Sequence, residues 1–478
     1  MPNLEQMIKI GFIPLADCAP LVVAQELGYF LDEGLEVHLA KAQSWDQLRS
    51  RLESGDVQAA HLLATLPLLS AFGIGGGACP VVTAWTLSQC GNAITLSNRL
   101  CREGVRTGVD LRQFLSKEGA PRSLRFGVVH PRSTHELMLR EWLSAGGQEI
   151  GNRVELVTSP PQEMVRRLRE GEIDGFCAGE PWNQRATTSK LGGIVAFGEE
   201  IMPASTEKVL AVRQDWHEAN KPVHAALLRA LSKASAWLGI EENLPQAARW
   251  LCDKKNVNTQ EGILLSALRR ELQAGWGKVA TGRRFLRFTG PGVNRPDVAD
   301  FRWYLERLVL WGHLQPQDLE LDLERICLSD FHREVFPLGD GSERLLPDEL
   351  DLEESLERIP CAVRRKLSLS GSRISTDVWC DIPLSLRRQL FLLPADTQAE
   401  IAEWAGHLKA ACPQVSGSEG ALTHASWRQK DHLPFTTLPD GTALDLPQWR
   451  SLDELVRFRL WEAVEAGHLD PAVAELVR

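Results

Sequence analysis

The sequence lacks the short motifs that identify several classes of metal and nucleotide proteins. No two of its ten cysteines form a C-x2-C pair, and its twelve histidines show no H-E-x-x-H or H-x3-H spacing. These absences argue against a zinc site or another metal site, and they favour reduced thiols. A G-x4-G-K-[ST] phosphate loop is also missing, which excludes a P-loop nucleotide hydrolase. We therefore expect a protein without a metal ion, a cofactor or catalytic residues.

The chain also lacks an excess of positive charge and a long apolar run. Its 53 Lys and Arg residues stand against 63 Asp and Glu residues, a formal net charge of −10, which argues against direct nucleic-acid binding or coating of an anionic membrane. The most apolar stretch, residues 62–78, contains Pro67 and four glycines, so it falls short of the about 18 apolar residues that cross a bilayer. Residues 1–12 show no secretory-signal pattern. We expect a cytoplasmic protein that does not enter the membrane.

The length of 478 residues corresponds to two or three compact domains of ordinary size. Short apolar runs alternate with amphipathic runs in the first part of the chain. Strands are expected at 8–13, 35–39, 57–61, 124–130, 154–157 and 173–178, and helices at 20–30, 44–55, 133–145 and 161–170. This alternation predicts an α/β fold of parallel sheets covered by helices, in two bodies with a ligand site between them.

The composition changes in the last third of the chain. From residue 222 the pattern is mainly helical, and Gly339, Asp340 and Gly341 predict a linker ahead of an acidic stretch. We place a domain boundary at about residue 340. The predicted two-lobe domain spans 1–340, with lobe 1 at about 7–95 plus 205–320 and lobe 2 at about 96–204. A small helical module follows at 341–478.

Two candidate ligand-binding residues lie in the first turns of predicted helices. Trp45 follows Ser44, a predicted N-cap, and His135 follows Ser133, which has Glu136 at the spacing of a capping box. Free backbone N–H groups at such helix starts favour a small anion. Each residue also has a structural interpretation, because most of the 15 tryptophans must be structural and a histidine in a first turn can simply face solvent.

Two further candidates lie beside predicted strands. Asn92 can donate through its amide, next to Gly91, which allows close backbone approach. Lys208 follows Glu207 ahead of an apolar run and offers a point charge with three donors. Taken alone, both are ordinary solvated or turn residues.

Six separated motifs resemble the nitrate- and bicarbonate-binding proteins of the NrtA and CmpA type. The motifs are residues 11–15 with 19–21, 26–30, 42–45, 91–95, 134–147 and 174–183, in the same order as in that family. The resemblance implies a two-lobed, periplasmic-binding-protein-like (type II) fold. It also implies that Trp45, Asn92, His135 and Lys208 contact the ligand, with asparagine replacing the family's glutamine. Lysine at 208 is similar to the nitrate binders, so the resemblance favours nitrate or nitrite.

Within that family, the chain resembles the cytoplasmic NasS-type nitrate/nitrite sensors. These hold a NasT-type RNA-binding antiterminator protein inactive until the anion binds, which makes such a protein the expected partner. Residues 345–410 resemble the nitrate reductase-associated proteins, through 356–360, 363–367, Trp379 and 392–404. This second resemblance adds nitrate reductase as a candidate partner.

Two other functions stay open. The chain could be the solute-binding component of an uptake system for nitrate, bicarbonate or a sulfonate. The pyrimidine-precursor synthases of thiamine metabolism share a related two-lobe fold, but they carry a clustered cysteine motif. No such cluster occurs here, and Cys177 is the only thiol in a segment expected at the ligand site.

Overall fold

The chain divides into two compact units. One unit comprises Met1–Thr289 and Val293–Val335, and the other Gly290–Gly292 and Phe336–Arg478. The computed structural model describes residues 7–74, 79–147, 153–202, 206–275, 278–280, 285–289, 293–336, 349, 352, 355–393, 395, 398–413, 415–417, 433–439, 443–446, 449, 452 and 454–468. The predicted linker at 339–341 lies outside these described residues.

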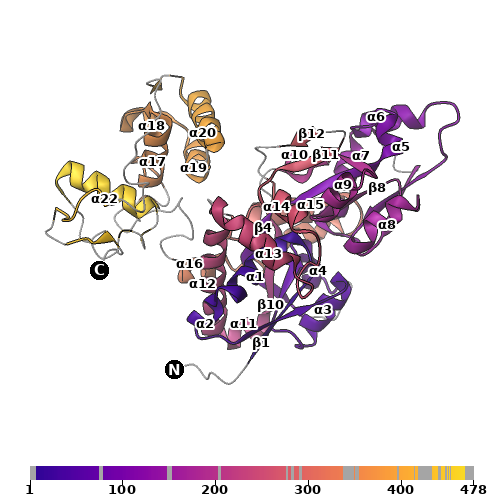
Figure 1. Ribbon diagram of the computed structural model, residues 1–478, viewed down its shortest axis with the longest axis horizontal. Coiled ribbons are helices and arrows are strands. Elements are labelled where there is room, and N and C mark those ends of the chain that lie inside the picture. Colours follow the sequence, from indigo (N-terminus) through magenta and orange to yellow (C-terminus); the bar gives the residue numbers. More distant parts are fainter. Residues whose placement is uncertain are drawn as a thin grey trace. The chain divides into compact units, whose positions relative to one another are not determined.

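The first unit contains two five-stranded sheets (Figure 1). The first sheet has the order β2-β1-β3-β10-β4 and is built from β1 (Ile8–Phe12), β2 (Val37–Lys41), β3 (Ala59–Leu63), β4 (Val81–Gln89) and β10 (Thr206–Arg213). The second has the order β7-β6-β8-β5-β9 and is built from β5 (Asn92–Ser97), β6 (Leu124–Val128), β7 (Val154–Thr158), β8 (Gly175–Gly179) and β9 (Gly192–Phe197). The predicted two-body α/β fold is confirmed.

The expectation of wholly parallel sheets is wrong for one strand in each sheet. Strand β10 runs antiparallel to both β3 and β4, and β5 runs antiparallel to β8 and β9. Both strands begin where the chain passes from one sheet to the other. At the first crossing Cys90 (φ 56°) and Gly91 (φ 92°) turn the chain from β4 into β5. A Cβ at Gly91 would lie 2.9 Å from Leu286 Cδ1, so this turn requires glycine both for its φ angle and for space.

Helices cover the sheets and connect their strands. The helices of the first unit are α1 (Ala19–Glu26), α2 (Tyr29–Asp32), α3 (Trp45–Glu53), α4 (Thr65–Ala71), α5 (Asn98–Arg102), α6 (Gly108–Leu115), α7 (Thr134–Ser144), α8 (Met164–Arg169), α9 (Trp182–Thr188), α10 (Gly198–Ile201), α11 (Gln214–Ala219), α12 (Lys221–Leu238), α13 (Leu244–Cys252), α14 (Glu261–Leu268), α15 (Val298–Leu310) and α16 (Ser329–Val335). A 3-10 turn, η1 (Ala16–Cys18), precedes α1, and a short hairpin joins β11 (Leu272–Gly275) to β12 (Lys278–Ala280).

Both N-caps predicted beside candidate ligand residues are confirmed. The Ser44 hydroxyl accepts from the Gln47 backbone N–H at 3.2 Å, and the Ser133 hydroxyl accepts from that of Glu136 at 3.1 Å. The predicted capping box at Ser133 is incomplete, because the Glu136 carboxylate accepts from the backbone N–H of Arg132 instead. Each cap fixes the first turn in which a candidate ligand residue lies.

One continuous apolar core joins the two lobes of the first unit. Leu62 and Val209 of the first sheet belong to the same buried cluster as Phe176 of the second and Tyr304 of α15. Helix α15 contacts both α4 and α7, and Arg307 pairs with Glu141 of α7 at 2.7 Å. The lobes are therefore closed on each other, and α15 is one of the elements that hold them.

The second unit is mainly helical where it is described. It contains α17 (Cys361–Ser370), α18 (Thr376–Asp381), α19 (Leu384–Leu392), α20 (Gln398–Ala411) and α22 (Glu454–Ala466), with the two-residue strands β13 (Ser372–Arg373) and β14 (Ser416–Gly417) (Figure 1). Trp379 and Trp404 are buried in its core and donate through Nε1 to backbone carbonyls, each at 2.8 Å. None of the described helices in either unit is long and apolar enough to cross a membrane.

Candidate functional site

The four residues predicted to bind a ligand are all buried in the first unit. Trp45 is the first residue of α3, Asn92 the first of β5 and His135 the second of α7, and Lys208 lies in β10. The Lys208 ammonium lies 5.7 Å from the centre of the Trp45 ring, in cation–π range. Three of the four positions are thus the starts of elements that approach β10 from different parts of the chain.

A bulge in β10 allows two consecutive side chains to face the same site. Neighbouring side chains of a regular strand point to opposite faces of the sheet. The pairing of β10 with β4 is shifted on both sides of Lys208 and skips Glu207, as a β-bulge does. The Glu207 Oε1 atom consequently lies 2.8 Å from Lys208 Nζ, and both side chains are fully buried.

Asp17 supplies a second carboxylate to the same lysine. Its Oδ2 atom lies 3.1 Å from Lys208 Nζ, and its Oδ1 atom lies 3.0 Å from Nε2 of His61 on β3. Burial by itself raises the pKa of Asp17, but the charges of Lys208 and His61 outweigh it and lower that pKa to about 2. Asp17 is therefore ionised at neutral pH, and from its place in the 3-10 turn η1 it pairs with Lys208 of β10.

Lys208 and Glu207 are ionised for the same reason. Burial disfavours the Lys208 ammonium, yet the adjacent charges of Asp17 and Glu207 raise the pKa of Lys208 above its ordinary value. Burial also disfavours the Glu207 carboxylate, but Lys208 and then His135 lower its pKa. Asp17, Glu207 and Lys208 form one buried network in which each charge favours the ionised form of the oppositely charged group beside it.

His135 lies on the other side of Glu207. Its Nδ1 atom is 3.8 Å from Glu207 Oε1, and the hydroxyl of Thr134 donates to that same oxygen at 2.6 Å. Burial lowers the pKa of His135 to about 4 even though the Glu207 carboxylate opposes the shift. The imidazole is neutral at pH 7.

The buried cluster formed by Asp17, His61, His135, Glu207 and Lys208 does not carry an excess of positive charge. One ammonium faces two carboxylates, so the positive charge of Lys208 is compensated within the cluster. The prediction from sequence considers the charge of Lys208 without these two carboxylates. The carboxylates of Asp17 and Glu207 both lie beside the lysine, although the sequence pattern did not place either of them there.

Several buried polar atoms of the site have no hydrogen-bond partner among the described residues. These include Trp45 Nε1, Asn92 Oδ1, His135 Nε2 and Glu207 Oε2. The Asn92 amide nitrogen makes only a weak contact with Met138 Sδ, at 3.9 Å. Because buried polar groups are almost always paired, such a group of unpartnered donors and acceptors indicates a place for a small polar ligand.

The backbone of Gly179 helps to locate this place. A Cβ at Gly179 would lie 3.5 Å from Asn92 Oδ1 and 3.6 Å from Asp17 Oδ2. The end of β8 thus brings Asn92, from the second sheet, close to the carboxylate that pairs with Lys208 of the first. The two lobes also meet here through a hydrogen bond from the Ala16 backbone N–H to the Glu180 carbonyl, at 2.9 Å.

Sequence reasoning missed three members of the buried cluster, namely Asp17, His61 and Glu207. Asp17 had a detectable signal, because it is an acidic residue within an otherwise apolar stretch. His61 was included only as the end of a predicted strand. Glu207 was noted beside Lys208, but strand alternation predicts that it faces away, and only the bulge reverses this expectation.

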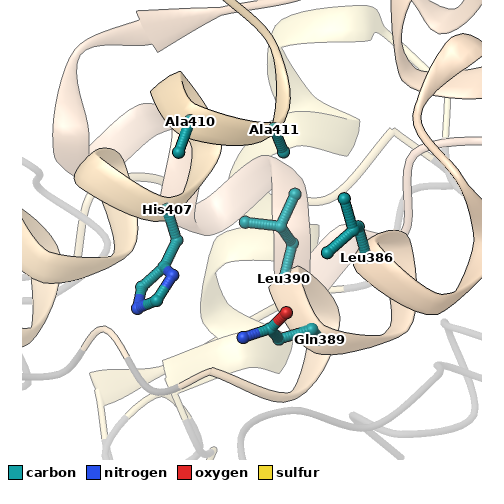
Figure 2. A pocket seen from close by; sticks show the side chains of 6 residues that line it. All are labelled: Leu386, Gln389, Leu390, His407, Ala410 and Ala411. Carbon is teal, nitrogen blue, oxygen red and sulfur yellow. The ribbon is translucent and has the colours of Figure 1, made fainter.

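The described part of the second unit has a small pocket of its own, of about 160 Å³. Figure 2 shows its lining by side chains of α19 and α20, which are Leu386, Gln389, Leu390, His407, Ala410 and Ala411. The lining is mostly apolar, and His407 is exposed and lies 3.7 Å from Glu403. Unlike the buried cluster of the first unit, this pocket does not bring several unpartnered polar atoms together.

The thiol considered for an enzymatic role is not activated. Cys177 lies in β8 and is buried, and both burial and the Glu207 carboxylate raise the pKa of its thiol. A protonated thiol is a poor nucleophile. Among the described residues, no three or more His, Cys, Asp or Glu side chains are placed to share a metal ion.

Residues 2–252 match the model of the NMT1-like family. The chain belongs to this family. Over 340 residues it is also 31% identical to the nitrate/nitrite binding protein NrtA of Synechococcus elongatus, covering 69% of this chain and 77% of NrtA. Residues 347–475 match the model of the conserved nitrate reductase-associated protein. Both resemblances expected from the sequence, to NrtA and to the reductase-associated protein, are confirmed.

The structural comparison agrees with the sequence comparison. The crystal structure of the periplasmic nitrate-binding protein NrtA from Synechocystis PCC 6803 superimposes with a TM-score of 0.66 at 25% identity, over 69% of this chain and 88% of that one. The bicarbonate transport ATP-binding protein CmpC of Synechococcus elongatus is 36% identical over 329 residues, or 68% of this chain. The chain spans about half the length of CmpC. The names of these NMT1-like relatives describe binding and transport of solutes.

Proposed function

We propose that the first unit is a sensor domain that binds nitrate or nitrite between its two lobes, at Trp45, Asn92, His135 and Lys208. The observation that carries the proposal is the convergence of these four buried side chains, three with unpartnered polar atoms, on one site of a solute-binding fold. A small planar oxyanion can accept hydrogen bonds from the Trp45 indole and the Asn92 amide, and charge-assisted bonds from Lys208. No covalent chemistry is required.

The proposed consequence of binding is a change in a protein partner in the cytoplasm. In the closed unit the Ala16–Glu180 hydrogen bond and the contact of His135 with Glu207 join the lobes close to the ligand residues. Anion binding would add contacts to the closed form, and a ligand shifts an equilibrium by its differential affinity for the two forms. We propose a NasT-type RNA-binding antiterminator as the partner. The similarity of the second unit to the nitrate reductase-associated protein makes nitrate reductase a further proposed partner.

A specific observation favours a second candidate ligand, bicarbonate. Glu207 Oε2 is a buried acceptor without a hydrogen-bond partner among the described residues. Bicarbonate carries a hydroxyl that can donate to such an acceptor, whereas nitrate carries none. In this alternative the chain is the solute-binding component of an uptake system, as the CmpC relative suggests.

The first test measures binding to the full chain. Isothermal titration calorimetry with nitrate, nitrite and bicarbonate is run on the wild type and on Trp45→Phe and Lys208→Met. We expect a dissociation constant for nitrate or nitrite that both substitutions raise at least tenfold. His38 of β2 is exposed, so His38→Gln is the control, and we expect its affinity for nitrate or nitrite to equal that of the wild type. Binding of bicarbonate but not of nitrate would establish the second candidate, and no binding of any of the three would contradict both.

The second test concerns the partner. The full chain is mixed with a NasT-type antiterminator, and complex formation is followed by size-exclusion chromatography with and without saturating nitrate. We expect a complex that dissociates with nitrate in the wild type and persists with Lys208→Met. The absence of a complex under both conditions would contradict the sensor role while leaving anion binding intact.

A further inference from the structure

We propose that nitrate binding takes up one proton, which converts His135 into an imidazolium that bridges Glu207 and the anion. The inference deepens the proposed function and rests on it. It concerns how an anion can enter a buried cluster that already contains two carboxylates and one ammonium. The proton comes from the solvent and no bond of the protein or of the anion is broken.

The geometry of His135 fits a bridging role. The ring is fully buried, its Nδ1 atom lies 3.8 Å from Glu207 Oε1, and its Nε2 atom has no hydrogen-bond partner among the described residues. A neutral imidazole has one N–H donor, so it can serve the carboxylate or an anion but not both. The imidazolium has two donors and can serve both. The capped first turn of α7 holds the ring in this position.

The balance of charge supplies the driving force. Nitrate adds a negative charge to a site whose fixed charges sum to no more than zero, and water is excluded from these side chains in the closed form. Opposite charges nearby favour protonation of a histidine, and the anion adds to the effect of Glu207. Uptake of a proton restores the charge that the cluster had before the anion entered.

The other titratable groups around His135 are less suited to take the proton. Lys208 of β10 is already charged, and Glu207 Oε1 already accepts from Thr134 and lies 2.8 Å from Lys208 Nζ. Asp17 of η1 lies against Lys208 and against His61 of β3. Protonation of either carboxylate would weaken the pairing of a buried ammonium.

His130, which precedes α7, is the remaining titratable group that faces His135. Its Nε2 atom lies 3.1 Å from Oδ1 of the exposed Asp46, so that partner is outside the buried cluster. His61 and His130 also have a carboxylate near Nε2 and a buried Nδ1 without a hydrogen-bond partner among the described residues. His135 differs from both because its carboxylate neighbour is Glu207 and because it is itself one of the four proposed ligand residues.

The number of protons can be measured directly. Calorimetric titrations of the full chain with nitrate are run at pH 7 in three buffers with different ionisation enthalpies, and the slope of heat against ionisation enthalpy counts the protons. We expect about one proton taken up per nitrate bound, and a dissociation constant that rises by about tenfold per pH unit between the pKa of His135 in the free protein, about 4, and its higher pKa in the complex. This sign follows because binding raises the pKa of the group, so affinity is highest at low pH. Nitrate binding without proton uptake would overturn the inference but not the proposed function.

Substitutions identify the residue that takes up the proton. In His135→Gln we expect weaker nitrate binding, proton uptake near zero and an affinity that no longer depends on pH. The variant His38→Gln, at an exposed position of β2, should keep the uptake of the wild type. Retention of full proton uptake in His135→Gln would show that another group takes the proton and would overturn the assignment.

A spectroscopic measurement does not depend on the variant binding nitrate. The wild type labelled with nitrogen-15 at histidine is observed by NMR with and without saturating nitrate, and the His135 signals are assigned from the spectrum of His135→Gln. We expect both ring nitrogens to be protonated in the nitrate complex and one in the free protein. A neutral ring in the complex would contradict the proposal. If nitrate does not bind at any pH, the proposed function itself fails.

Discussion

The ammonium nitrogen of Lys208 lies 3.1 Å from Asp17 Oδ2, and both side chains are buried. Because its charge is already paired with Asp17, Lys208 is not simply a free positive charge that attracts an anion. Breaking a buried ion pair by removing one partner costs about 3–5 kcal/mol, and the lower end of this range applies to Asp17 because Lys208 keeps Glu207 as a second partner. The pair therefore stabilises the closed unit, and it also limits how strongly the site attracts an anion.

Asp17→Asn tests both consequences. We expect nitrate to bind about tenfold more tightly, because one negative charge near the anion is lost, and we expect the free energy of unfolding to fall by about 3 kcal/mol. Calorimetry and urea denaturation measure the two effects. The control is Asp56→Asn, at an exposed carboxylate paired with Arg51, which should leave both quantities essentially unchanged. Weaker nitrate binding in Asp17→Asn would mean that Asp17 itself orients the ligand.

Gly179→Ala tests the position of the ligand. The added methyl group would lie at ordinary contact distance from Asn92 Oδ1 and Asp17 Oδ2, at 3.5 and 3.6 Å, so we expect the folded unit to accept it. The methyl group would occupy space beside the proposed ligand residue Asn92, and we expect nitrate affinity to fall at least tenfold. Thermal melting with and without nitrate separates the effects, since the intrinsic melting temperature should change by less than the nitrate-induced shift. Unchanged affinity would place the ligand away from β8.

Ser133→Ala tests the link between the cap of α7 and the ligand. Loss of the N-cap hydrogen bond to Glu136 N–H should lower the free energy of unfolding by about 1 kcal/mol. Because His135 lies in the same turn, nitrate affinity should also fall severalfold. The matched control is Ser97→Ala, which removes the N-cap of α5 and should lower stability without changing affinity. Equal effects of the two variants on affinity would contradict this link.

Asp300→Asn should stabilise the protein at alkaline pH. The Asp300 carboxylate on α15 accepts from the Thr206 backbone N–H at 2.6 Å, and burial raises its pKa to about 7 against the opposing effect of that hydrogen bond. A carboxyl whose folded-state pKa exceeds its unfolded-state value costs stability as pH rises from about 4 to about 7, and the full cost remains above pH 7. Asparagine keeps an acceptor oxygen without the charge.

The expected gain from Asp300→Asn is near zero below pH 4 and roughly 2–4 kcal/mol at pH 8. Urea denaturation of the wild type and the variant across this pH range measures it. A gain of equal size at every pH would point to packing rather than ionisation. Asp297→Asn is not a suitable control, because Asp297 caps α15 by accepting from the Ala299 N–H. Substitution of Asp318 or Asp322 near the same helix would also remove a cap, so Asp56→Asn serves here as well.

The sequence by itself determined the local features of this protein. The caps at Ser44 and Ser133 were predictable because each bond joins a side chain to a backbone group three residues away. The alternation of apolar runs predicted two α/β bodies, and the ordered motifs predicted the family that the comparisons confirm. Trp45, Asn92 and His135 lie in those motifs, and the family resemblance added Lys208. Their role as ligand contacts remains a proposal.

The tertiary structure decided the direction of β5 and β10 and the charge of the site. Strand direction depends on where the chain crosses between sheets, which local periodicity does not encode. The approach of Asp17 to Lys208, 191 positions later in the chain, depends on the packing of η1 against β4, the neighbour of β10 in the first sheet. The inward position of Glu207 depends on a bulge that breaks strand alternation. Charge pairing over such separations is set by the folded chain, because a pKa responds to spatial neighbours and to burial rather than to sequence neighbours.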